Sequence, residues 1–138
     1  MNQTLAIIKP DATGSGKAGR VLAHLEAAGF KLRAARMIRM TRAQARSFYA
    51  VHSERPFYDS LVEFMTSDPC IPILLEAPDA VPRLRKVIGA TDPGEAAEGT
   101  VRRMYAESRE RNAIHASDSD ENATREIAFF FAEAERIG

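Results

Sequence analysis

Histidine, cysteine and glycine-rich segments are the parts of this 138-residue sequence that could carry chemistry. The histidines are His24, His52 and His115, and the only cysteine is Cys70. Their spacing is not that of metal ligands, and one thiol cannot form the thiolate pair of a zinc site. The glycine-rich GSGKAG at 14–19 lacks the Ser or Thr that follows Lys in a phosphate-binding loop. It predicts a flexible turn before a helix instead.

His115 has the surroundings of a reactive side chain. It lies in NAIHASDS at 112–119, where small neighbours leave the imidazole uncrowded. Neutral imidazole is abundant near pH 7 and can attack phosphorus without prior deprotonation by a base. Ser117 and Glu126 could orient the ring nitrogen that does not react. A purely structural histidine is the alternative at this point.

Attack on phosphorus also requires positive charge near the phosphate, because phosphoryl transfer depends on positioning and charge stabilisation. Lys9, Arg85 and Arg102 are candidates, since each lies at the end of an element or the edge of a loop. Their spacing in the sequence does not by itself bring them together.

Hydrophobic periodicity predicts the elements that must position these residues. It predicts strands at 4–8, 31–40, 70–76 and 112–115, and helices at 18–28, from Thr41 to about Val51, from Pro56, at 78–87, and after a cap at Asp118 or Ser119. The segment 89–100, GATDPGEAAEGT, has little periodicity, and a loop of this length in a compact domain is often functional. The order predicts an α+β sandwich of about four strands, formed by residues 1–138 as one domain.

Composition excludes several classes of function. The charges of 19 Lys and Arg residues balance those of 19 Asp and Glu residues, so no global charge favours binding to nucleic acid, which we do not expect as a partner. Cys70 alone excludes an intramolecular disulfide and suits a reducing compartment. No apolar run approaches the ~20 residues of a membrane span, and the start MNQTLAIIKPD is unlike a signal peptide. We therefore expect a cytoplasmic protein with no membrane partner.

Six motifs in register resemble the nucleoside diphosphate kinase family from Thr4 to about Phe131. The most specific is Asn112-x-x-His115-Ala116-Ser117-Asp118, and the others are Ile8-Lys9-Pro10-Asp11, Tyr49 with Arg55-Pro56-Phe57-Tyr58, Phe64-Met65-Thr66-Ser67, Gly89-Ala90-Thr91-Asp92-Pro93 and Gly99-Thr100-Val101-Arg102. The resemblance implies a ferredoxin-like βαββαβ sandwich with a four-stranded antiparallel sheet. It also implies transfer of the γ-phosphoryl group of a nucleoside triphosphate, mainly ATP, to nucleoside and deoxynucleoside diphosphates. The route would be ping-pong, through phosphohistidine.

The resemblance also assigns roles to individual residues. His115 would be the nucleophile through Nδ1, with Glu126 and Ser117 supporting its ring. Phosphates would contact Lys9, Arg85, Thr91 and Arg102, with Tyr49 holding Lys9, while Asn112 and Lys9 would reach the sugar hydroxyls and Phe57 would stack on the base. Mg²⁺ would arrive on the nucleotide phosphates rather than on protein side chains. Self-association into a tetramer or hexamer is expected, with 89–100 joining subunit contacts to the cleft.

A site that accepts every base should use stacking and sugar or phosphate contacts, because every base has a π-face. Phe57 suits that need. The family usually has an aliphatic residue opposite, where this chain has Arg109. Its guanidinium could stack on the base, or it could turn to solvent beside Glu107 or Glu110. Ala116, in place of a usual glycine, leaves the assigned side chains intact.

Two alternatives belong to other functional classes. A regulatory module that kept the fold but lost turnover would be expected to lack the histidine or a phosphate-binding cation. A phosphohistidine carrier would not need Phe57, Thr91 and Asn112 arranged for a nucleotide. Labelling with γ-labelled ATP and chase with an unlabelled diphosphate distinguishes the three.

Overall fold

A four-stranded antiparallel sheet is the centre of the computed structural model, which describes residues 1–137. The strands lie in the order β2-β3-β1-β4. Their bounds are β1 Gln3–Ile8, β2 Lys31–Ala35, β3 Ile71–Glu76 and β4 Ile114–Ala116. β1 pairs with both β3 and β4, and β2 pairs with β3, all antiparallel. This is the ferredoxin-like sheet implied by the resemblance, so that prediction is confirmed.

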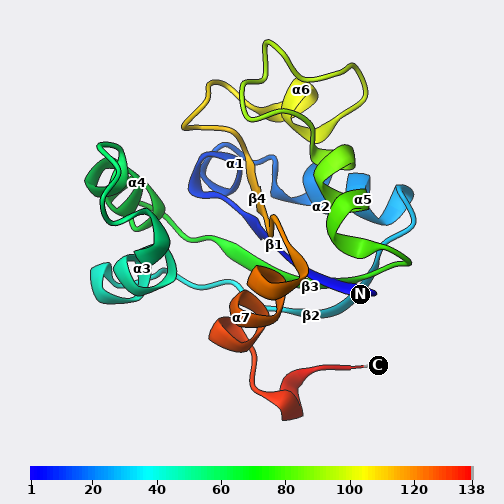
Figure 1. The fold of residues 1–138 in the computed structure, drawn as a ribbon. Coiled ribbons are helices and arrows are strands. Elements are labelled where there is room, and N and C mark those ends of the chain that lie inside the picture. Colours follow the sequence, from blue (N-terminus) through cyan, green and yellow to red (C-terminus); the bar gives the residue numbers. More distant parts are fainter. Residues whose placement is uncertain (138) are drawn as a thin grey trace.

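Helices cover both faces of the sheet (Figure 1). The α-helices are α1 Pro10–Gly14, α2 Ala18–Ala27, α3 Arg42–Phe48, α4 Tyr58–Met65, α5 Ala80–Ile88, α6 Val101–Tyr105 and α7 Asp120–Phe130, with short 3₁₀ turns at Ala50–His52 and Glu133–Glu135. Helices α2, α5 and α6 lie on one side, and α3, α4 and α7 lie on the other (Figure 1). The sheet is therefore the middle layer of a sandwich.

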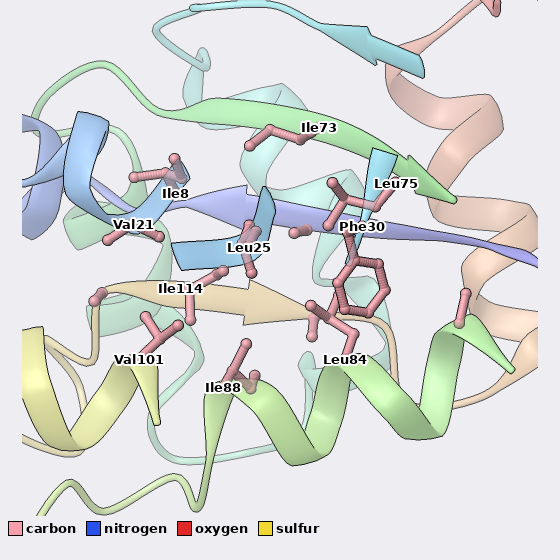
Figure 2. Close-up of a cluster of buried hydrophobic side chains, with 14 of the residues drawn as sticks. Ile8, Val21, Leu25, Phe30, Ile73, Leu75, Leu84, Ile88, Val101 and Ile114 are labelled. Atoms are coloured by element: carbon pink, nitrogen blue, oxygen red, sulfur yellow. The ribbon is translucent and has the colours of Figure 1, made fainter. Parts of the chain in front are cut away.

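Alternation along β1 divides the core into two clusters. Ala6 and Ile8 point to the side of α2 and α5, where they pack with Leu25 and Leu84 (Figure 2). Leu5 and Ile7 point to the opposite side, toward α3, α4 and α7. Successive side chains of a strand face opposite sides, so one apolar run supports both layers. His115 pairs with Ile7 and therefore shares the face of α3 and α7.

The strand predicted at 31–40 is shorter in the structure. Pairing of β2 with β3 shifts between Leu32 and Ala34 and ends at Ala35, although Ile38 still forms an isolated bridge with Cys70. The irregular stretch includes Arg36 and Met37, where apolar and polar residues do not alternate in the sequence. An irregularity in register removes the regular ladder from the remaining residues.

Two short helices were not predicted from the periodicity. Pro10 begins α1, where its missing N–H and fixed φ suit a first helical position. The side chain of Thr100 accepts a hydrogen bond from the N–H of Arg103 and so caps α6. Both helices have five residues, too few for an apolar stripe to repeat. Predicted caps at Thr41 and Ser119 are present, and each accepts from a backbone N–H three residues on.

The predicted loop at 89–100 is closed at its base. Gly89 has a φ of +90°, and a Cβ atom there would lie 2.6 Å from Thr100 Oγ1. Only glycine permits that backbone and that close approach. Inside the loop, Asp92 accepts a hydrogen bond from the N–H of Gly94. The loop is thus a compact unit with adjacent ends, which presents Thr91 toward the sheet edge at β4.

Candidate active site

Two adjoining cavities lie at the end of the sheet where β1 and β4 meet α1. One, of about 400 Å³, is lined by Lys9, Phe57, Leu61, Thr91, Arg109 and Glu110. The other, of about 380 Å³, includes Tyr49, Phe57, Arg85, Thr91, His115 and Glu126 in its lining. Phe57 and Thr91 line both, so the two cavities adjoin at these residues. Together they have room for a ring system in one part and a phosphate chain in the other.

His115 is held by its Nε2 atom. This nitrogen lies 2.7 Å from Oε1 of Glu126, which is buried on α7. Ser117 Oγ donates to the same carboxylate oxygen at 2.9 Å. A carboxylate accepts only, so the neutral imidazole must carry its proton on Nε2. The lone pair is then on Nδ1, which has no hydrogen-bond partner among residues 1–137.

Aromatic rings restrict the imidazole on other sides. Phe48 and Tyr49, at the end of α3, meet it edge-on with ring centroids at 5.5 and 6.1 Å. The side chain of His115 retains 22% of its exposure. The ring is therefore fixed in orientation but open to a ligand in the cavity, which favours the reactive interpretation over the structural one.

Lys9, which lines the cavity of Phe57, forms a buried pair with Asn112. Lys9 Nζ donates to Asn112 Oδ1 at 2.8 Å and to the carbonyl oxygen of Glu110 at 3.1 Å. Burial lowers the pKa of Lys9 to about 8, opposed by the carboxylate of Asp11. Asn112 Nδ2 also reaches the carbonyl oxygen of Thr91 at 3.4 Å, which connects the pair to the 89–100 loop. Tyr49, predicted to hold Lys9, lies edge-on to the His115 ring, with 6.1 Å between the ring centroids.

The two predicted arginines bond to opposite ends of β4. Arg85 lines the cavity of His115 and donates to the carbonyl oxygen of Ala116 at 3.1 Å. Arg102 is buried and donates to the carbonyl oxygens of Gly89 and Ile114 at 3.1 and 2.8 Å. Arg102 thus connects the base of the loop to the start of β4. Burial lowers its pKa to about 10, so it stays cationic near neutral pH.

The backbone before His115 has an unusual conformation. Ala113 has a φ of +73°, and the N–H of Ile114 donates to the carbonyl oxygen of Asn112 at 2.9 Å. A positive φ is rare for residues with a Cβ atom, and its cost is of order 1–3 kcal/mol. The predicted strand at 112–115 therefore begins two residues later, at Ile114. Alanine carries no sequence signal for this turn.

Several residues that line the cavity of His115 were not proposed from the sequence. Phe48, Asp118, Asn122 and Arg125 surround His115 in its cavity. Arg125 lies 3.7 Å from Oε2 of Glu126, and Asn122 donates to Asp118 at 2.7 Å. Asn122 and Arg125 lie on α7, so their positions could have been inferred from the helical period once Glu126 was placed, whereas Phe48 comes from the end of α3 and carries no such signal.

Arg109 lines the same cavity as Phe57. The ion pair with Glu107 is made by its neighbour Arg111, at 3.2 Å. Glu110 instead accepts a hydrogen bond from Ser60 at 2.9 Å. The carboxylates of Glu107 and Glu110 thus bond to other residues, and Arg109 lines the cavity as an exposed residue.

Within residues 1–137, no group of three His, Cys, Asp or Glu side chains could hold a metal ion. No helix in the same part of the chain is long and apolar enough to cross a bilayer.

Comparison with known proteins agrees with this geometry. The sequence profile of the family described as "Nucleoside diphosphate kinase" matches residues 2–136. Relatives with that name from Chlorobium chlorochromatii and Phenylobacterium zucineum are each 54% identical, over 99% of this chain and 98% of theirs. The solved nucleoside diphosphate kinase of Aquifex aeolicus is 44% identical, with a TM-score of 0.96 over 99% of both chains. That of Halobacterium salinarum, in complex with CDP, is 35% identical, with a TM-score of 0.94 over 100% of this chain and 93% of the other. The chain therefore belongs to the nucleoside diphosphate kinase family, enzymes of phosphoryl transfer between nucleotides.

Proposed function

We propose that this enzyme transfers the γ-phosphoryl group of a nucleoside triphosphate, mainly ATP, to nucleoside and deoxynucleoside diphosphates through phosphohistidine at His115. The observation that carries the proposal is the 2.7 Å contact of His115 Nε2 with buried Glu126. It leaves the Nδ1 lone pair free on a ring that lines the same cavity as Arg85.

In the first half-reaction, Nδ1 attacks the γ-phosphorus. A P–N bond forms as the bond to the β–γ bridging oxygen breaks, and the diphosphate leaves with that electron pair. The imidazole gains positive charge in this step, and the Glu126 carboxylate stabilises it. In the second half-reaction a different diphosphate attacks the phosphorus, the P–N bond breaks, and neutral His115 is restored. Donor and acceptor use one site in turn, as a ping-pong route requires.

We assign the base to the cavity between Phe57 and Arg109. Phe57 is 48% exposed and can stack on a base from any nucleotide. Lys9 lines the same cavity and bonds to Asn112, so this pair would meet the sugar hydroxyls, and Lys9 would also contact phosphate. That the Halobacterium salinarum relative was solved in complex with CDP supports nucleotide binding by this chain.

The phosphate chain would extend from this cavity to His115. Thr91 lines both cavities and Arg85 lines the second, so both can contact phosphate oxygens. Arg102 would contribute its positive charge from the start of β4, where it bonds to the carbonyl oxygen of Ile114. If it released a backbone carbonyl oxygen, it would donate directly to a phosphate oxygen. Tyr49 and Ser117 would support the ring and Glu126, respectively.

Mg²⁺ would enter with the nucleotide and be coordinated mainly by phosphate oxygens. The donor set of the cavity fits this arrangement, because Glu126 is already bonded to His115 and Ser117 while Asp118 offers one further carboxylate. When bound, the ion would neutralise phosphate charge and orient the chain for in-line transfer.

Self-association into a tetramer or hexamer is part of this proposal. β2 is an edge strand, and an edge presents backbone groups that a second copy can pair with or cover. Cys70 is buried as a free thiol, which suits the reducing cytoplasm. Light scattering at low micromolar concentration should give a mass several times 15.2 kDa. A fully active monomer would contradict the assembly.

The test of the reaction is transfer of label. The enzyme incubated with γ-labelled ATP and Mg²⁺ should retain label that is acid-labile, alkali-stable and lost on addition of GDP. His115→Gln should retain none, while His24→Gln, a matched change at a distant histidine, should label like the parent. Persistent labelling of His115→Gln would refute the assignment.

A further inference from the structure

The turn that precedes His115 is held from one place in the fold, the junction of β1 and α1. The carbonyl oxygen of Ala113 accepts the N–H of Lys9, and its N–H donates to Asp11 Oδ2, both at 2.9 Å. Both peptide groups around the residue with positive φ are therefore bonded to this junction. No other side chain of residues 1–137 bonds to the Ala113 backbone.

Asp11 is an unusual residue for such a position. Its side chain is only 3% exposed, and its Oδ1 atom has no hydrogen-bond partner among the described residues. Burying a carboxylate costs free energy unless its oxygens are bonded. Here only Oδ2 accepts a hydrogen bond, and its donor is the backbone N–H of Ala113, two residues before His115.

We propose that Asp11 is a positioning residue for the reaction: its carboxylate holds the Ala113 turn in the conformation from which β4 presents His115. This rests on the proposed role of His115 as nucleophile. β4 has three residues, lies at the edge of the sheet and pairs only with β1. So short a strand cannot by itself hold the preceding turn in its strained conformation. Positioning matters because a shift of about 1 Å at the reacting atom can lower a rate by roughly 100-fold.

The charge of Asp11 also raises the pKa of Lys9, and two substitutions at Asp11 separate this effect from the positioning of the turn. The carboxylate faces Lys9 and Arg111, and Lys9 also faces Arg102 and Glu110. Burial and Arg102 lower the pKa of Lys9, while Asp11 and Glu110 raise it. Asp11→Asn keeps an oxygen acceptor for Ala113 but removes the charge, whereas Asp11→Ala removes both.

The experiment measures the single-turnover rate of His115 phosphorylation from γ-labelled ATP at saturating nucleotide. Asp11→Ala should lower this rate about 10–100-fold, because the ring is less well placed. Asp11→Asn should stay within about threefold of the parent near pH 7, while the alkaline fall of its kcat/KM moves to lower pH. Glu76→Gln removes a carboxylate from an ion pair with Arg33, at the end of β3 away from His115, and should match the parent.

Ala113→Gly provides the decisive comparison. Glycine adopts a positive φ without steric cost, so the turn depends less on Asp11. The double variant Asp11→Ala/Ala113→Gly should be phosphorylated at least fivefold faster than Asp11→Ala. If Asp11→Ala does not fold, the double variant is compared with Ala113→Gly alone. Its single-turnover rate should then be less than about threefold below that of Ala113→Gly.

Three results would overturn the inference. One is a parental rate in folded Asp11→Ala. Another is a loss in Asp11→Asn as large as in Asp11→Ala near pH 7. The third is a loss of 10-fold or more for Asp11→Ala in the Ala113→Gly background. Failure of the parent to label His115 would instead refute the proposed function, so the two failures are distinguishable.

Discussion

Replacing Glu126 by Gln tests whether the charge beside His115 stabilises the reaction. The amide can still accept from Nε2 and from Ser117 through one oxygen, so shape and hydrogen bonding are retained. What is lost is the negative charge 2.7 Å from a ring that becomes cationic when Nδ1 bonds to phosphorus.

The size of the effect follows from the two kinds of hydrogen bond. A bond to a charged group contributes about 1.5–3 kcal/mol, and a neutral one about 0.5–1.5 kcal/mol. Their difference, about 1–1.5 kcal/mol, corresponds to a rate roughly 5–13-fold lower. Glu126→Ala removes the bond entirely and leaves the buried hydroxyl of Ser117 without this acceptor, so a loss of about 10–150-fold is expected.

Rapid-quench labelling with γ-labelled ATP at saturating nucleotide measures this step apart from product release. Glu121→Gln, the same chemical change at an exposed position in the first turn of α7, serves as the control and should leave the rate unchanged. Equal rates for the parent, Glu126→Gln and Glu126→Ala would show that the carboxylate neither orients the ring nor stabilises its charge.

Three further substitutions or conditions test the binding residues. Phe57→Ala should weaken binding of all nucleotides by about 1–3 kcal/mol, because stacking does not depend on base edges; KM values for several diphosphates measure this, and a loss confined to one base would contradict it. Arg109→Ala should raise KM for GDP more than for CDP, since a purine covers more of the guanidinium, with single-turnover labelling by ATP nearly unchanged; an unchanged ratio of the two KM values would favour a solvated arginine. The kcat/KM for ATP should fall as pH rises through about 8, where Lys9 loses its proton. In the unfolded chain lysine keeps its proton to about 10.4, so between about pH 8 and 10.4 the unfolded chain binds more protons than the folded one. Lys9 therefore makes the free energy of unfolding rise with pH in that range. A profile flat from pH 7 to 9.5 would refute the Lys9 assignment, and Lys9→Met should lack the rise in stability.

Much of the site could be anticipated because its chemistry is carried by residue types. A histidine among small neighbours, with a carboxylate eleven positions later, predicted an oriented imidazole, and the contact with Glu126 is present. Phe57, Arg85 and Thr91 were assigned through the resemblance and line the cavities. Continuous apolar runs also located β1 and β3 to within one residue at each end.

The parts that were not anticipated depend on tertiary contacts rather than on local patterns. Ala113 has no intrinsic preference for positive φ, and its conformation follows from bonds to Lys9 and Asp11, distant in sequence. Arg102 resembled a phosphate ligand, but in this structure its guanidinium bonds to backbone carbonyls. Such partners become evident only when β1 and β4 are placed side by side.

The position of β1 at the centre of the sheet also constrains how the protein is made. β1 is the first strand to leave the ribosome, yet one of its two neighbours, β4, is among the last elements to be synthesised. Until then, one edge of an almost wholly buried apolar strand, QTLAII, has no partner. Pairings between distant segments form slowly, and an open apolar edge can recruit other chains. A nascent chain that ends before β4 therefore carries Lys9 and Phe57 but cannot assemble the pocket, and its apolar edge stays open until β4 is made.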